Sequence, residues 1–122
     1  MNLIHDVELI TIGALAKLAS ITADALRHYE RLGLITPACI SPETGYRYYT
    51  AAQADDLARI GALKAFGFPL AQIKEIMNQP GASAVITQLR TRYAELLQER
   101  NRITAAMALL AEEIKLYEED SQ

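Results

Sequence analysis

The sequence predicts a mainly helical protein: a winged helix-turn-helix domain with a small β-hairpin wing, followed by a long antiparallel coiled-coil dimerisation helix. Three observations favour this fold class. Two short amphipathic segments are separated by a brief break, a turn-rich stretch has aromatic and β-branched flanks, and the last third repeats apolar residues every three and four positions. We expect the winged domain over residues 1–77, a linker over 78–83, the coiled-coil helix over 84–118 and a tail over 119–122.

The first two helices are each preceded by a residue that can cap them. Thr11 can accept a hydrogen bond from the first turn of one helix, and Thr22 from the first turn of a second helix over 23–31. Gly33 is placed to end the second helix. The apolar faces expected to point inward consist of Ile12, Leu15, Ala16 and Leu18 in the first helix and Ala25, Leu26 and Tyr29 in the second.

A β-hairpin is expected next, with Ile40 on one strand and residues 46–49 on the other. Pro42 and Gly45 provide turn chemistry between them. Side chains alternate along a strand, so Arg47 and Tyr49 should share one face and Tyr46 and Tyr48 the other. Since one face must pack on the domain, we expect two of these four residues in the core.

Two further helices complete the domain. Thr50 and Gln53 have the spacing of a capping box, and they precede a helix of about sixteen residues that stops at Gly67. A fourth helix restarts near Leu70. We expect its inward-facing residues to be Ile73, Ile76 and Met77.

The segment from Ser83 to Glu118 contains no glycine or proline and carries two apolar seams with a seven-residue repeat. An amphipathic helix folded back on its own domain is the alternative to a dimer interface. The expected dimerisation residues are Ile86, Leu89, Tyr93, Leu96, Ile103, Met107, Leu110, Ile114 and Tyr117, with Arg100 as the polar member of the seams. Residues 78–102 carry a net charge of +2 and residues 103–122 a net charge of -4. An antiparallel pair places these opposite charges against each other, so we expect that orientation.

Composition and motifs argue against several other classes of protein. The start of the chain lacks the basic and long apolar regions of a signal peptide, and no run of 18 apolar residues predicts a membrane span. The only cysteine, Cys39, cannot form an internal disulfide, which fits a reducing compartment and predicts a cytoplasmic location. His5 and His28 form no recognisable set with a nucleophile, and no phosphate-binding glycine loop is present. We therefore expect no enzyme activity, no cofactor and no metal.

A DNA-binding function fits the helix-turn-helix pattern despite the formal net charge of -3. The second helix of such a motif enters the major groove, and here it carries Arg27 and His28 on its outer part. Arg47 stands in the wing, and Lys64 is placed to reach a phosphate. Solvated surface charges are the alternative for Arg27 and Lys64, and a coiled-coil interaction module without DNA is the alternative for the whole chain.

Several strings in order resemble the MerR family of bacterial transcription regulators. They are TIGALAK (11–17), ALRHYERLGLITP (25–37), GYRYYT (45–50), IGALK (60–64) and GFPLAQIK (67–74). The long helix that follows matches the family's antiparallel dimerisation helix. The string RYYT (47–50) is most similar to the multidrug-sensing branch, whereas the cysteines of metal-sensing members are missing from the long helix and its flanks.

The resemblance implies a homodimer that binds double-stranded, pseudo-palindromic promoter DNA and distorts its spacer, so that RNA polymerase engages both promoter elements. It identifies no effector. It implies a DNA-contacting set of Thr22, Arg27, His28, Tyr29, Arg47, Tyr48 and Lys64. His28 replaces the family's usual aromatic residue. Asp24 also departs from the pattern: an acid there costs affinity unless it accepts a hydrogen bond from a cytosine amine or pairs with a nearby arginine.

Overall fold

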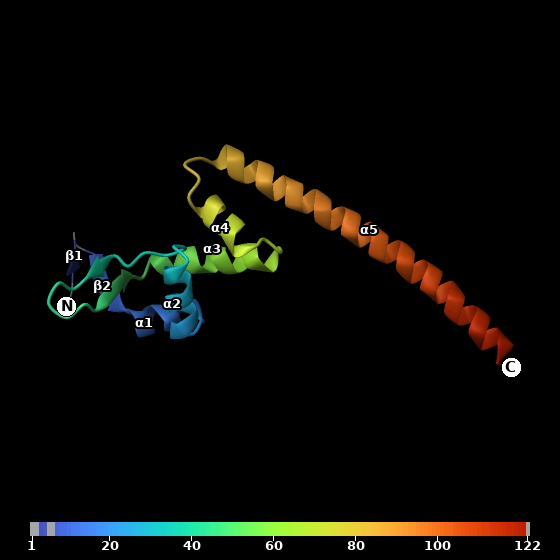
Figure 1. Ribbon diagram of the computed structural model, residues 1–122, viewed down its shortest axis with the longest axis horizontal. Coiled ribbons are helices and arrows are strands. Elements are labelled where there is room, and N and C mark those ends of the chain that lie inside the picture. Colours follow the sequence, from blue (N-terminus) through green and yellow to red (C-terminus); the bar gives the residue numbers. More distant parts are fainter. Residues whose placement is uncertain (1–2, 5–6, 122) are drawn as a thin grey trace. The chain divides into compact units, whose positions relative to one another are not determined.

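A computed structural model describes residues 3–4 and 7–121 of the 122-residue chain. It divides into two compact units, Met1–Gln79 and Pro80–Gln122. The first unit holds a small sheet and four helices, and the second is formed by one long helix (Figure 1). The mainly helical class with a hairpin wing, expected from the sequence, is therefore confirmed.

The sheet is antiparallel and its strands follow the order β1-β2-β4-β3. Its bounds are β1 Leu3–Ile4, β2 Val7–Thr11, β3 Cys39–Ile40 and β4 Arg47–Thr50. The pair β3–β4 is the predicted wing, with Ile40 opposite Arg47. The strand β2 was not predicted, although it pairs with β4 over Leu9↔Thr50 to Thr11↔Tyr48. As a result β4 lies between two hydrogen-bonded neighbours.

The helix-turn-helix consists of α1 (Ile12–Ala19) and α2 (Ala23–Arg31). Both predicted caps form: the N–H of Ala14 donates to Thr11 Oγ1 at 3.2 Å, and the N–H of Ala25 donates to Thr22 Oγ1 at 3.0 Å. The turn between the helices passes through Ser20 in a left-handed conformation, with φ 57°. Gly33 follows α2 with φ 76°, a conformation that glycine adopts without steric cost.

The core of the first unit is apolar and draws on every helix in it. Helices α3 (Gln53–Ala65) and α4 (Leu70–Met77) complete the set. The core residues are Leu15, Ala16, Leu26, Tyr29, Leu34, Ile35, Tyr49, Leu57, Ile60, Leu63, Phe68, Ile73 and Ile76.

Three details of the predicted core and helix ends differ from the structure. Leu18 is exposed, because it lies near the end of α1, beyond the turn that packs inward. Only Tyr49 of the four wing residues is fully buried, since a strand as short as β4 covers the core with a single side chain. Gln53 Oε1 does accept from the N–H of Thr50 at 3.0 Å, yet α3 has 13 residues rather than about sixteen.

The second unit is the helix α5, Ala82–Asp120, with 39 residues. It begins two residues before the expected start and continues two residues past the expected end. None of its residues is buried. Leu89 is of intermediate exposure, and the other predicted apolar seam residues are between 39% and 72% exposed. Most of the seam surface is therefore exposed in the described chain. No described helix has the length and hydropathy needed to cross a membrane.

Candidate nucleic-acid interface

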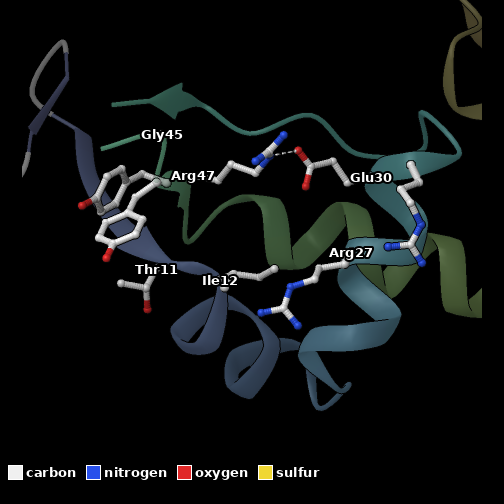
Figure 2. A pocket seen from close by; sticks show the side chains of 9 residues that line it. Thr11, Ile12, Arg27, Glu30, Gly45 and Arg47 are labelled. Carbon is white, nitrogen blue, oxygen red and sulfur yellow. Dashed lines mark hydrogen bonds and ion pairs between the residues drawn. The ribbon is translucent and has the colours of Figure 1, made fainter. Parts of the chain in front are cut away.

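A groove with a volume of about 580 Å³ lies between α2 and the wing. Its lining comes from the start of α1, from α2 and from residues 45–48. Figure 2 shows Arg27 and Arg47 extending toward this groove from different elements. Arg31 also lines it, so the lining holds three arginines and one carboxylate, that of Glu30. The lining is therefore net positive, although the chain as a whole has a net charge of -3.

The predicted residues at the start of α2 lie on its exposed side. Arg27 Nη1 donates to Asp24 Oδ1 at 2.9 Å, and the side chain of Asp24 remains 94% exposed. Asp24 thus takes one of the two expected arrangements, pairing with a neighbouring arginine. Such an exposed pair adds little stability, because water screens it. His28 is exposed as well, whereas the Thr22 hydroxyl oxygen is engaged in its helix cap.

Tyr29 and Lys64 lie together although 35 positions separate them in the sequence. Lys64 Nζ donates to the Tyr29 hydroxyl at 3.3 Å and lies 5.6 Å from the centre of its ring. Tyr29 is buried, in agreement with its predicted place on the inward face of α2. Its ring packs in the core, so a contact with DNA is limited to its hydroxyl group. Lys64 itself is exposed.

Glu30 is the residue at this site that sequence reasoning missed. Arg47 Nε donates to Glu30 Oε1 at 2.6 Å, and the Tyr49 hydroxyl donates to Glu30 Oε2 at 3.2 Å. A signal was available: Glu30 stands four residues after the buried Leu26, at the border of the apolar face of α2. A carboxylate there requires partners. They come from the wing, 17 and 19 positions away.

The remaining predicted wing residue, Tyr48, lines the groove and is partly buried. Tyr46 precedes the strand and is exposed. Among the described residues, no group of three or more histidine, cysteine, aspartate or glutamate side chains is arranged to hold a metal ion.

Burial raises the pKa of Tyr49 to about 12, and the negative charge of Glu30 acts in the same direction. The folded state therefore binds this proton more tightly than the unfolded state, whose tyrosine pKa is 10.0. The stabilisation is fully present below pH 10 and is lost as the pH rises toward 12. We predict that the free energy of unfolding falls by about 1.4 kcal/mol per pH unit in this window.

Urea unfolding near pH 9 and pH 11, followed by circular dichroism, measures this loss. Tyr49→Phe is the reference, because it removes the titrating proton and keeps the ring. The pH dependence of the variant should be flatter than that of the wild type over the same window. Equal slopes in the two proteins would contradict the assignment.

Comparison with known proteins identifies the family of this chain. Residues 10–80 match the family model described as MerR HTH family regulatory protein, and residues 54–112 match one described as MerR, DNA binding. The HTH-type transcriptional regulator CueR of Vibrio cholerae is 34% identical over 109 residues, which cover 87% of this chain and 76% of CueR. The multidrug-efflux transporter 1 regulator of Bacillus subtilis is 41% identical over 68 residues, 56% of this chain.

A solved structure agrees with these matches. A transcriptional regulator of the MerR family from Bacillus cereus has a TM-score of 0.66 and 27% identity, covering 86% of this chain and 79% of that one. The chain spans only 24% of the Bacillus subtilis regulator and 38% of another relative, the transcriptional regulator BrlR of Pseudomonas aeruginosa. The resemblance inferred from the ordered motifs is confirmed: the chain belongs to the MerR family of helix-turn-helix regulatory proteins.

Proposed function

We propose that this chain is a homodimeric, sequence-specific DNA-binding regulator of transcription. It binds a pseudo-palindromic promoter and distorts the spacer DNA, which lets RNA polymerase engage both promoter elements. The observation that carries the proposal is the groove between α2 and the wing, whose lining includes Arg27, Arg31 and Arg47. The family description of DNA binding over residues 54–112 supports it, and so do the relatives named as transcriptional regulators.

The site residues divide into two roles. Arg27 and His28 extend from the exposed side of α2, where the second helix of a helix-turn-helix motif reads base edges. Arg47 and Tyr48 from the wing, with Lys64 and the hydroxyl of Tyr29, fit contacts to the phosphate backbone. Thr22 contributes at the start of α2, where its hydroxyl proton remains available for donation while the oxygen accepts from Ala25.

The exposed apolar seams and the charge distribution of α5 support the proposed dimer. Its seams are exposed in the single described chain, and 39 helical residues extend roughly 58 Å. An apolar stripe of this length is stabilised when a second copy covers it. The basic first half and the acidic second half of α5 favour an antiparallel partner. A dimer also presents two copies of α2 to two half-sites, as a pseudo-palindrome requires.

A binding selection tests the proposal. The wild-type protein is used to select duplexes from a random DNA pool, and we expect a pseudo-palindromic consensus. In gel shifts on a selected duplex, Arg27→Ala and Arg47→Ala should each weaken binding by about tenfold or more, since an arginine contact to DNA is worth ~1–3 kcal/mol. Dimer mass, measured by light scattering, should not change.

Arg59→Ala is the matched control, because it removes the same charge from an exposed position outside the groove. Its affinity should stay within about twofold of the wild type. Two results would count against DNA binding through this surface: a selection that yields no consensus, or full affinity in both groove variants. The coiled-coil interaction module without DNA would then regain support.

A further inference from the structure

Glu30 joins the second helix of the helix-turn-helix motif to the wing. Its two carboxylate oxygens accept from two residues of β4, Arg47 and Tyr49, which are two positions apart and therefore on the same face of the strand. Figure 2 shows Arg47 reaching across the groove to Glu30 on α2. The Glu30 side chain is only 17% exposed. Water therefore screens this ion pair less than it screens the pair of Asp24 and Arg27.

A carboxylate in this place is unfavourable for a surface that faces DNA. Glu30 lines the groove and repels phosphate groups through its charge. A second contribution of Glu30 to DNA binding has to offset this repulsion. The contact between Glu30 and Arg47 indicates what this contribution is.

Glu30 engages Arg47 through Nε alone. A guanidinium group has five N–H donors in a rigid plane, so fixing Nε also fixes the direction of the two terminal nitrogens. Those nitrogens have no other hydrogen-bond partner within the described residues, which leaves them available for phosphate oxygens. The Tyr49 hydroxyl anchors the other oxygen of the carboxylate and so reduces its freedom to follow a moving arginine.

We propose that Glu30 is a positioning residue for DNA recognition: it holds Arg47 and the wing at a set distance from α2, so that both reach a duplex of matching backbone geometry. This inference rests on the proposed DNA-binding function. Glu30 then contributes to DNA-binding specificity without touching DNA itself. A wing held at a fixed position discriminates between duplexes by their shape.

The direction in which one substitution changes DNA affinity distinguishes a positioning role of Glu30 from a purely electrostatic one. Glu30→Gln keeps the shape of the side chain and removes its negative charge. If Glu30 acted only as a charge near phosphates, the variant would bind DNA more tightly. If Glu30 positions Arg47, the variant binds the selected duplex more weakly, despite its more positive surface.

The experiment compares affinities for a duplex selected by the wild-type protein and for a random-sequence duplex. We expect Glu30→Gln to weaken binding to the selected duplex about tenfold, as expected when one partner of a poorly exposed charge pair is lost. Binding to the random duplex should be unchanged or stronger. Glu75→Gln is the matched control: it makes the same substitution at an exposed position of α4, outside the groove, and it should not weaken binding to the selected duplex.

A double-mutant cycle with Arg47 tests whether Glu30 acts through it. In an Arg47→Ala background, Glu30→Gln should cause no further loss of specific affinity. Arg47→Lys covers the case in which Glu30→Gln does not fold. This variant keeps the positive charge but lacks the Nε that Glu30 holds. Specific affinity should fall about as far as in Glu30→Gln, while the dependence of binding on salt stays that of the wild type.

The inference is overturned if Glu30→Gln binds the selected duplex as tightly as the wild type or more tightly. It is also overturned if the loss persists undiminished in the Arg47→Ala background, or if Arg47→Lys retains wild-type specific affinity. These outcomes differ from a failure of the proposed function, in which the wild-type protein itself selects no duplex.

Discussion

Ile103→Asp is expected to abolish the dimer. Ile103 lies near the middle of α5, and about half of its surface is exposed in the described chain, so the substitution leaves the fold of a single chain intact. In an antiparallel pair that aligns position 89 with 110, Ile103 packs against Leu96 of the second copy. Each dimer would then bury two unpaired carboxylates, so dimer affinity should fall on the order of a hundredfold or more.

Sedimentation or light scattering at micromolar concentration measures the loss, and circular dichroism checks the helix. Gln98→Asp is the control, because it adds the same charge two positions beyond Leu96, on the opposite face of α5. Operator binding should fall together with dimerisation, since a monomer presents a single copy of α2. A dimeric Ile103→Asp variant with wild-type affinity for the operator would show that the seams are not the interface.

Cysteine crosslinking should distinguish the two possible orientations in an all-or-none manner. With Cys39 replaced by alanine, a chain carrying both Leu89→Cys and Leu110→Cys should form a covalent dimer under oxidising conditions. Each single variant should remain uncrosslinked. The two positions are 21 residues apart on one helix, roughly 31 Å, so they cannot join within a chain.

Crosslinking of the single variants, measured on non-reducing gels, is the informative control. In a parallel pair, position 89 faces position 89 of the second copy, and Leu89→Cys alone would crosslink efficiently. That result would contradict the antiparallel arrangement inferred from the charge halves of α5. The charges would then have to be explained by contacts outside the pair.

The features that were predictable from sequence depend on neighbours within a few residues. Thr11 and Thr22 cap helices whose first turns follow directly, and Gly33 ends α2 because the chain there needs a positive φ. The repeat in α5 likewise follows from helical geometry alone. Each of these could be argued from local spacing without knowing the rest of the fold.

The features that were missed depend on residues far apart in the sequence. Glu30 forms its hydrogen bonds with Arg47 and Tyr49 of the wing. Tyr29 forms its hydrogen bond with Lys64, 35 positions away. The strand β2 is short, and it becomes recognisable only once β4 lies beside it. Hydrophobic periodicity shows which face of a segment is apolar. It does not show which polar side chain of another helix or strand lies against that segment.

The central place of β4 in the sheet has a consequence for how the wing can vary. Because β4 pairs with β2 through residues 48–50 and with β3 through Arg47 and Tyr48, the positions of Arg47 and Tyr49 are set by the base of the hairpin. The tip, from Ser41 to Gly45, is held by its own turn and by hydrogen bonds with the backbone of Tyr46, which lies just before β4. Insertions at the tip should therefore lengthen the wing without shifting Arg47. Among relatives, the length of the wing can then vary while the position of this arginine stays the same.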